Sequence, residues 1–145
     1  MNNLKPIEIL LVEDNKSDQF MTERAFSKGR IYNNIHIAQD GEVAMDILKQ
    51  RGEYADSKRP DIVLLDINLP KKNGQEVLTE IKNDSDLKTI PVIMLSSSEA
   101  EEDIFRSYNL HANGYIPKPV DVTHFKDIVN AIEDFWFTIV RLPKD

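Results

Sequence analysis

Short runs of apolar residues alternate along this chain with longer stretches in which apolar residues recur at helical spacing. A continuous apolar run of about four to eight residues is typical of a strand buried on both faces, as in a parallel sheet. Five such runs separated by helical segments predict an α/β fold with a parallel sheet and helices on both faces. The predicted strands are 7–12, 35–38, 62–65, 92–95 and 114–116.

Capping residues and i, i+4 spacing mark the predicted helices. In the first helix, Ser17 can cap the N-terminus, Met21 and Ala25 share the buried face, and Gly29 stops the helix. The last helix has the longest apolar stripe, and Asp121 can cap it. The remaining helices are predicted after Asp40–Gly41 and up to Gly52, from about Gly74 with Val77, Leu78 and Ile81 packed inward, and around Ile104 and Tyr108.

Composition narrows the class of protein. A chain of 145 residues with 41% apolar content fits one domain with a single core. The formal charge of −7 argues against nucleic acid as a partner, because nucleic acid attracts basic surfaces. No signal-peptide layout or membrane-length apolar run is present and cysteine is absent, so we expect a cytoplasmic protein without a membrane partner.

Charged residues follow three of the predicted strands at their carboxyl ends. Asp66 ends the third run, Glu13 and Asp14 end the first, and Lys118 follows the fifth. If these strands are parallel neighbours, their carboxyl ends converge where ligands bind in open α/β sheets. Carboxylates about 4 Å apart repel by roughly 4 kcal/mol at an effective dielectric of about 20. The sequence therefore predicts an acidic pocket poised for a divalent metal ion.

The same positions carry a resemblance to a known family. The motifs are Glu13-Asp14 after the first run, Asp66-Ile-Asn-Leu-Pro-Lys-Lys-Asn-Gly74 after the third, Ser96 after the fourth, and Tyr115-Ile-Pro-Lys118-Pro119 at the fifth. In this order at strand ends they resemble response-regulator receiver domains of the CheY type, over about residues 5–140. The resemblance implies a single receiver domain over 1–145 with a doubly wound (βα)5 fold of the flavodoxin or CheY kind and a parallel sheet of strand order 2-1-3-4-5.

The resemblance also implies a metal site and a phosphoacceptor. Asp66 would be the carboxylate nucleophile that takes a phosphoryl group. Glu13, Asp14 and Asp66 would bind Mg²⁺, or Mn²⁺, together with the backbone carbonyl of Asn68. Hard cations of this kind prefer oxygen ligands.

Three further residues would respond to the phosphoryl group. Lys118 would pair first with Asp66 and then with the phosphoryl oxygens, and Ser96 would donate its hydroxyl to one of them. Tyr115 would rotate between exposed and buried positions as the reporter of the switch. A helix-capping role for one of the serines at 96–98 and a plain packing role for Tyr115 remain as alternatives.

The end of the chain bears on output and partners. Only about five residues follow the last helix, so we expect a stand-alone receiver that signals through a changed surface and is a switch, not an enzyme. Its tail resembles the single-domain receivers partnered with phytochrome-type histidine kinases. Extra apolar residues on the last helix suggest a homodimer contact, with the alternative that the helix covers its own core. These residues are Phe135, Trp136, Phe137, Ile139 and Val140.

Three other functions share parts of this pattern. A flavin-binding flavodoxin-like protein shares the sheet, but the loop 13–16, with Glu13 and Asp14, would repel a phosphate. A phosphatase of the aspartyl-phosphate type presents a second aspartate two residues after its nucleophile, where this chain has Asn68. The third is a receiver that docks its partner without phosphorylation.

Overall fold

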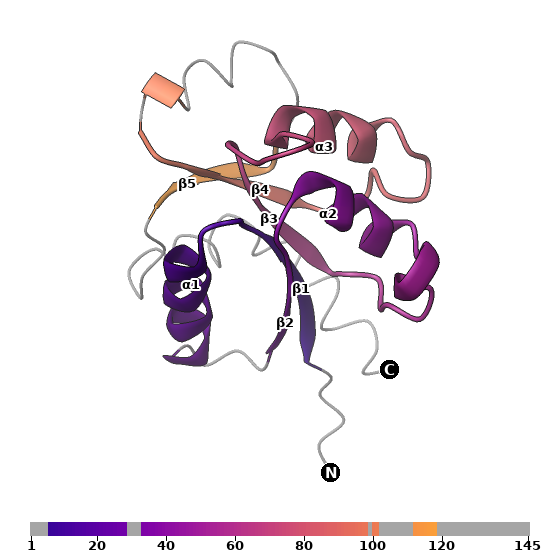
Figure 1. The fold of residues 1–145 in the computed structure, drawn as a ribbon, viewed down its shortest axis with the longest axis horizontal. Coiled ribbons are helices and arrows are strands. Elements are labelled where there is room, and N and C mark those ends of the chain that lie inside the picture. The colour runs from indigo at the N-terminus through magenta and orange to yellow at the C-terminus, as the bar shows by residue number, and fades with distance from the viewer. Residues whose placement is uncertain (1–5, 29–32, 99, 102–111, 119–145) are drawn as a thin grey trace.

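The computed structural model describes residues 6–28, 33–98, 100–101 and 112–118, which form a parallel sheet with helices on both faces (Figure 1). The sheet has five strands in the order β2-β1-β3-β4-β5, which confirms the predicted fold class. The strands are β1 (Ile7–Val12), β2 (Asn33–Ala38), β3 (Ile62–Asp66), β4 (Val92–Ser96) and β5 (Gly114–Pro117). The other elements are α1 (Lys16–Lys28), α2 (Gly41–Leu48), the short 3₁₀ helix η1 (Gly52–Tyr54) and α3 (Gly74–Lys82).

Every predicted strand is present, and each of the last four is slightly longer than its apolar run. Asp66 is the final residue of β3 and pairs with Leu95 of β4. Ser96 ends β4 and pairs with Pro117 of β5. The hydrogen-bonded ladder therefore continues one residue past the apolar run on both β3 and β4. This extension fixes the height of Asp66 and Ser96 on neighbouring strands.

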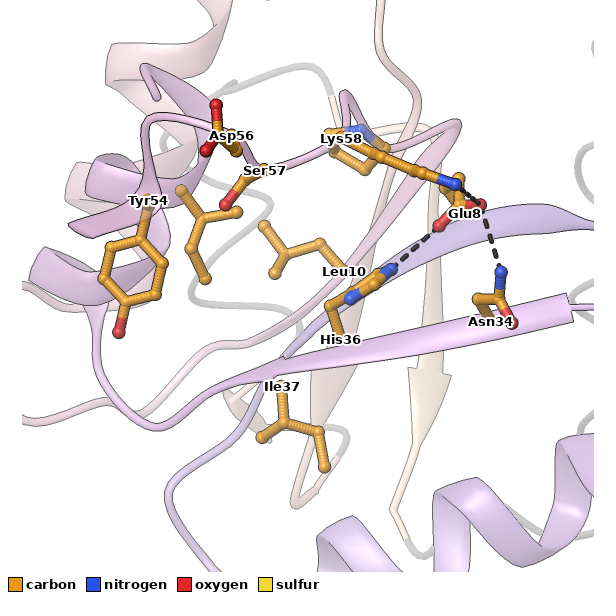
Figure 2. Close-up of a pocket in the computed structure, with 11 residues that line it drawn as sticks. Glu8, Leu10, Asn34, His36, Ile37, Tyr54, Asp56, Ser57 and Lys58 are labelled. Atoms are coloured by element: carbon orange, nitrogen blue, oxygen red, sulfur yellow. Dashed lines mark hydrogen bonds and ion pairs between the residues drawn. The ribbon is translucent and has the colours of Figure 1, made fainter. Parts of the chain in front are cut away.

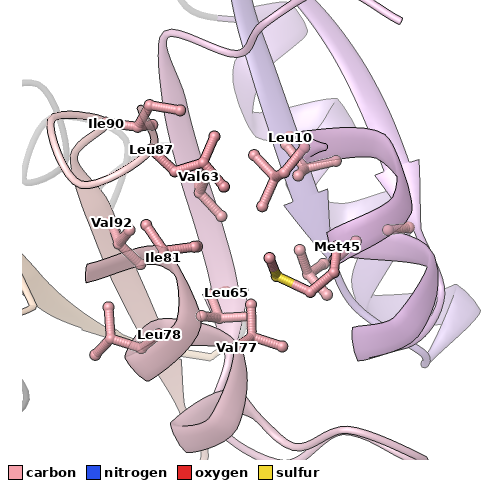
Figure 3. Close-up of a cluster of buried hydrophobic side chains, with 14 of the residues drawn as sticks. Leu10, Met45, Val63, Leu65, Val77, Leu78, Ile81, Leu87, Ile90 and Val92 are labelled. Atoms are coloured by element: carbon pink, nitrogen blue, oxygen red, sulfur yellow. The ribbon is translucent and has the colours of Figure 1, made fainter. Parts of the chain in front are cut away.

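Two apolar clusters lie on opposite faces of the sheet because successive strand residues point to opposite faces. One face packs under α2 and α3, where Leu10 and Leu65 meet Met45 and Val77 (Figure 3). The other face packs under α1 and contains Phe26. Val77, Leu78 and Ile81 are buried as predicted for the third helix. Since both faces are covered, β1, β3 and β4 read as apolar runs in the sequence, interrupted only by Glu8 in β1 and ended by Asp66 and Ser96.

The N-terminus of α1 differs from the prediction. Asn15, not Ser17, caps the helix, since its side-chain oxygen accepts the backbone N–H of Asp18 at 2.9 Å. Ser17 lies inside the first turn and is exposed. Both asparagine and serine can cap a helix, and here the cap is Asn15, which directly follows Glu13 and Asp14.

The buried face of α1 is also partly different from the prediction. Ala25 is buried as expected, but Met21 is 38% exposed. Thr22 and Phe26 are buried instead, and with Ala25 they form the stripe against the sheet. The true stripe is thus shifted by one residue from the i, i+4 pair that the sequence suggested.

The end of α2 was predicted too late. Asp40 caps its start by accepting the backbone N–H of Val43 at 2.8 Å, but the helix ends at Leu48 rather than at Gly52. Gln50 takes a left-handed backbone conformation with a φ of 55°, and this breaks the helix two residues before the glycine. Gly52 instead begins η1, within the long polar connection to β3.

Several predictions fall outside the described residues. These are the end of the first helix at Gly29, the helix around Ile104 and Tyr108, the last helix with its Asp121 cap, and the apolar residues 135–140 proposed as a dimer contact. Among the helices that the structure describes, none has the length and apolar character needed to cross a membrane.

Candidate functional site

Four charged or polar residues meet at the carboxyl edge of the sheet. Asp66 ends β3, Glu13 directly follows β1, Ser96 ends β4 and Lys118 directly follows β5. The strand order places these four ends side by side. Asp66, Glu13 and Ser96 are each at most 1% exposed. A carboxylate this deeply buried is costly unless partners compensate it.

The carboxylates of Glu13, Asp14 and Asp66 converge on one point. One oxygen atom from each residue lies within 4.8 Å of the other two. Glu13 and Asp66 are buried and Asp14 is exposed, so the cluster opens to solvent on one side. Burial, and then the negative charge of Asp66, raises the pKa of Glu13 to about 7. Among the residues that the structure describes, the pocket thus holds more negative charge than its neighbours neutralise.

Lys118 is the cation of this cluster and contacts three carboxylates. Its Nζ lies 2.9 Å from Asp66 Oδ2, 3.3 Å from Glu13 Oε1 and 3.1 Å from Asp18 Oδ2. Burial opposes the charge on Lys118, but the hydrogen bond to Asp66 and the attraction of the carboxylates outweigh it and raise the lysine pKa. Lys118 is therefore charged at neutral pH, and one positive charge faces several negative ones.

The loop after β3 turns back on Asp66. The backbone N–H of Asn68 donates to Asp66 Oδ1 at 3.0 Å, and the N–H of Gly74 donates to the carbonyl of Ile67 at 3.1 Å. Asn68 itself is exposed. The main chain at Asn68 is therefore held beside the phosphoacceptor candidate, where its carbonyl was predicted to serve as a metal ligand.

Two glycines give this loop the clearance that it needs. A Cβ on Gly74 would lie 2.5 Å from the backbone oxygen of Asp66. A Cβ on Gly41, at the start of α2, would lie 1.9 Å from the backbone oxygen of Lys72. Both distances are too short for any side chain. Lys71, in the same loop after β3, has a left-handed φ of 65°. The starts of α2 and α3 thus hold the loop against the site.

Ser96 and Tyr115 lie on the two strands beyond Asp66. The carbonyl of Ser96 accepts the backbone N–H of Lys118 at 2.7 Å, which ties the start of the β5 extension to the end of β4. Tyr115 is half-buried and packs against the core on the α2 and α3 side. The structure thus brings Ser96 into the site, whereas Tyr115 lies one strand further out.

Two residues at the site were missed in the sequence. Asp18, on the first turn of α1, contacts Lys118, and its signal was its position one helical turn after Asp14. Glu101 joins the two loops that follow β3 and β4, and its signal was the capping-box spacing from Ser98. Neither signal shows from the sequence alone that the residue reaches the site.

A second group of polar residues lies toward the other end of β1. Glu8 is 9% exposed, and its carboxylate contacts His36 at 2.8 Å, Asn34 at 3.2 Å and Lys58 at 3.9 Å (Figure 2). These residues line a cavity of about 430 Å³ beside β2 and η1. Burial alone would raise the pKa of Glu8, but the hydrogen bonds from His36 and Asn34 lower it. The neighbours of this carboxylate therefore favour its charged form.

The donor set at the carboxyl edge fits a hard divalent cation. Three carboxylates with converging oxygens, one of them open to solvent, match the oxygen ligands and retained water that Mg²⁺ prefers. One of the three, the buried carboxylate of Asp66, is held by Lys118 and by the backbone N–H of Asn68. Fold and site together define a doubly wound α/β domain with an acidic pocket at its carboxyl edge that fits a divalent cation.

The comparison with family models gives this class its name. The response regulator receiver domain model matches residues 9–130, so the chain belongs to that family. It is 46% identical over 138 residues to the response regulator Rcp1 of Synechocystis, an alignment that covers 95% of this chain and 94% of the relative. The chain is therefore a receiver domain of two-component signalling, as its motifs predicted.

Solved structures agree with this assignment. The bacteriophytochrome response regulator AtBRR matches with a TM-score of 0.82 at 41% identity, covering 90% of this chain and 93% of that one. The phosphorylated cyanobacterial phytochrome response regulator RcpA matches with a TM-score of 0.76 at 47% identity, covering 93% and 96%. Rcp1 with Mn²⁺ bound matches with a TM-score of 0.74 at 46% identity, covering 90% and 94%.

Proposed function

We propose that Asp66 accepts a phosphoryl group from a histidine kinase in a reaction that needs Mg²⁺. The observation that supports this most directly is the buried Asp66 carboxylate, 2.9 Å from Lys118 and within 4.8 Å of oxygens of Glu13 and Asp14. A nucleophile, a cation for the phosphoryl oxygens and a set of metal ligands are thus in one place. The proposal is supported by two relatives, since RcpA has a solved structure in a phosphorylated form and Rcp1 has one with Mn²⁺ bound.

The transfer moves one phosphoryl group between two side chains. An oxygen of Asp66 forms the new P–O bond while the P–N bond to the kinase histidine breaks, and the imidazole keeps the electron pair of that bond and takes up a proton. Bound Mg²⁺ would neutralise charge on the phosphoryl oxygens. Glu13 and Asp14 would hold the ion with Asp66 and the carbonyl of Asn68, and Lys118 would supply the remaining positive charge.

The acyl phosphate then acts as the signal. It adds a charge of about −1.5 to −2 at the carboxyl edge of the sheet. Lys118 and the hydroxyl of Ser96 are drawn toward its oxygens, and the change is passed to the surface near Tyr115. The protein is in this proposal a switch that has no substrate other than its own phosphoryl group.

The kinase is proposed to be of the phytochrome type. The support is the likeness to AtBRR and RcpA, whose names record that they are phytochrome response regulators. A cytoplasmic location remains a prediction from the sequence, as does the homodimer contact at residues 135–140. Sedimentation at high micromolar concentration, with and without a phosphoryl mimic, tests that contact, and a monomer in both conditions would exclude it.

The phosphoacceptor is tested with a small phosphodonor, Mg²⁺ and intact mass spectrometry. The wild type is expected to gain one phosphate and Asp66→Asn none. Asp40→Asn is the matched control, because Asp40 is also a buried aspartate, with 6% exposure, but serves as the cap of α2. Equal labelling of the wild type and Asp66→Asn would overturn the assignment, as would loss of labelling in both variants.

A further inference from the structure

Glu101 connects the two loops on either side of Asp66. Its Oε1 accepts the backbone N–H of Ser97 at 2.7 Å, and its Oε2 accepts the side-chain amide of Asn68. Its own backbone N–H donates to the hydroxyl of Ser98 at 3.1 Å, as in a helix cap. A cap explains the contacts within 97–101. It does not explain the contact with Asn68, which is 33 residues away in the sequence.

The bridge lies next to the groups that phosphorylation must move. Asn68 donates its backbone N–H to Asp66, so one residue touches both carboxylates. Ser97 follows Ser96, the residue expected to donate to the phosphoryl group. With Glu101 in place, the main chain at Ser97 after β4 is therefore tied to the side chain of Asn68 after β3.

A phosphoryl group on Asp66 would oppose this bridge. It adds negative charge to Asp66, which shares the neighbour Asn68 with the Glu101 carboxylate, and like charges repel. It also draws Ser96 inward, which pulls on the chain at Ser97. Both effects favour release of Glu101 from its two partners.

We propose that Glu101 is a latch that holds the unphosphorylated form by joining Asn68 to Ser97, and that phosphorylation of Asp66 opens it. The inference rests on the proposed phosphoacceptor function. Glu101 is in this view a positioning residue, since it acts through the two loops and not on the phosphorus. A latch of this kind lowers the affinity of the resting protein for any phosphoryl group or mimic.

The test measures binding of beryllofluoride with Mg²⁺, a mimic of the phosphoryl group. Glu101→Gln keeps the shape and removes the negative charge, and it is expected to bind the mimic about five- to tenfold more tightly than the wild type. Glu76→Gln is the matched control. Glu76 occupies the same capping position in α3, where it accepts the N–H of Asn73, and it is exposed and outside the site. Its affinity for the mimic is expected to match that of the wild type.

Hydrogen exchange in the wild type adds a measurement in which a cap that is independent of phosphorylation would show no response to the mimic. In the wild type, beryllofluoride is expected to speed exchange in the peptide that contains Ser97, and in Glu101→Gln the same peptide is expected to exchange faster before the mimic is added. Asn68→Ala, which removes only the other end of the bridge, should also tighten binding. Combined with Glu101→Gln, it should add little further tightening.

The outcomes distinguish a failure of the latch proposal from a failure of the phosphoacceptor proposal. If the wild type fails to bind the mimic and fails to take up phosphate, the phosphoacceptor proposal is wrong. If the wild type binds but Glu101→Gln has the affinity of the wild type and of Glu76→Gln, the latch is wrong and the phosphoacceptor stands. A Glu101→Gln variant that binds more weakly and melts at a lower temperature would show a structural cap only, which also overturns the latch.

Discussion

Strand β1 places buried glutamates near its two ends, and their surroundings are opposite. Glu8 has one carboxylate against His36, Asn34 and Lys58, and its pKa is lowered. Glu13 shares a single lysine with other carboxylates, and its pKa is raised to about 7. The first glutamate is neutralised by the protein itself, whereas the second leaves an excess of negative charge. That excess distinguishes a binding site from a structural ion cluster.

The contrast between Glu13 and Glu8 is expected to be largest in their effects on metal affinity. Glu13→Gln should weaken Mg²⁺ binding by roughly 10- to 100-fold, at least the loss seen when outer-shell partners of metal ligands are removed. Glu8→Gln should leave Mg²⁺ affinity unchanged, because its cluster lies toward the other end of β1. Titration calorimetry measures both. An equal loss in the two variants would mean that the acidic edge is not the metal site.

Removal of the cation from each cluster is expected to have unequal effects on stability. Lys118→Met leaves buried carboxylates facing one another and should lower the free energy of unfolding by about 2 to 3 kcal/mol at neutral pH, with partial recovery in Mg²⁺. Lys58→Met should change it by less than about 0.5 kcal/mol, because the Lys58 side chain is 70% exposed. Denaturant unfolding in chelator measures the difference, and similar losses would contradict the contrast.

The dependence of stability on pH should also differ between the two glutamates. Glu13 binds its proton more tightly in the folded state, so its contribution is complete below the ordinary value of 4.5 and is lost as the pH rises through about 7. Metal-free protein should therefore lose about 1 kcal/mol between pH 6 and pH 8. Glu8 has a lowered pKa, so its contribution is present above 4.5 and is lost only as the pH falls below that value.

This pH effect is measured by denaturant unfolding in chelator at pH 6, 7 and 8. Glu13→Gln should flatten the profile, and Glu8→Gln should keep its slope. A wild-type profile as flat as that of Glu13→Gln would show that Glu13 does not titrate in this range.

The smallest effect on stability is expected in the cluster around Glu8. Glu8→Gln keeps some hydrogen bonds but loses the charge, so the free energy of unfolding should fall by about 1 kcal/mol. His36→Gln should cost a similar or smaller amount, and the double variant should cost less than the sum because the two side chains share one contact. Thermal unfolding at neutral pH provides the measurement, and strictly additive losses would mean that the His36 contact does not stabilise the fold.

Strands were more predictable from this sequence than helix ends. The three inner strands were found because a parallel sheet buries both of their faces and leaves a nearly unbroken apolar signal. The edge strands β2 and β5 are only partly buried and gave a weak run and a short one. The cap of α1 was assigned to Ser17 instead of Asn15, because neighbouring residues of similar capping strength cannot be ranked without coordinates. The end of α2 was placed at Gly52, because the sequence does not reveal that Gln50 adopts a left-handed conformation.

The site was predictable where residues lie at strand ends and unpredictable where they arrive from helices. The strand order alone brings Glu13, Asp66 and Lys118 together. Asp18 and Glu101 reach the same place through contacts that depend on how a helix start is set against the sheet. Sequence spacing reports the helix start but not its distance from the site.

The two glycines that clear the loop after β3 affect how mutational data on this protein should be read. In a scan of all single substitutions, Gly41 and Gly74 are expected to be about as intolerant as Asp66, since even an alanine would collide with backbone oxygen atoms at these positions. Neither residue binds or transfers anything. A ranking by intolerance alone would place them among the residues that take part in the chemistry, although their role is to leave room for the neighbouring backbone.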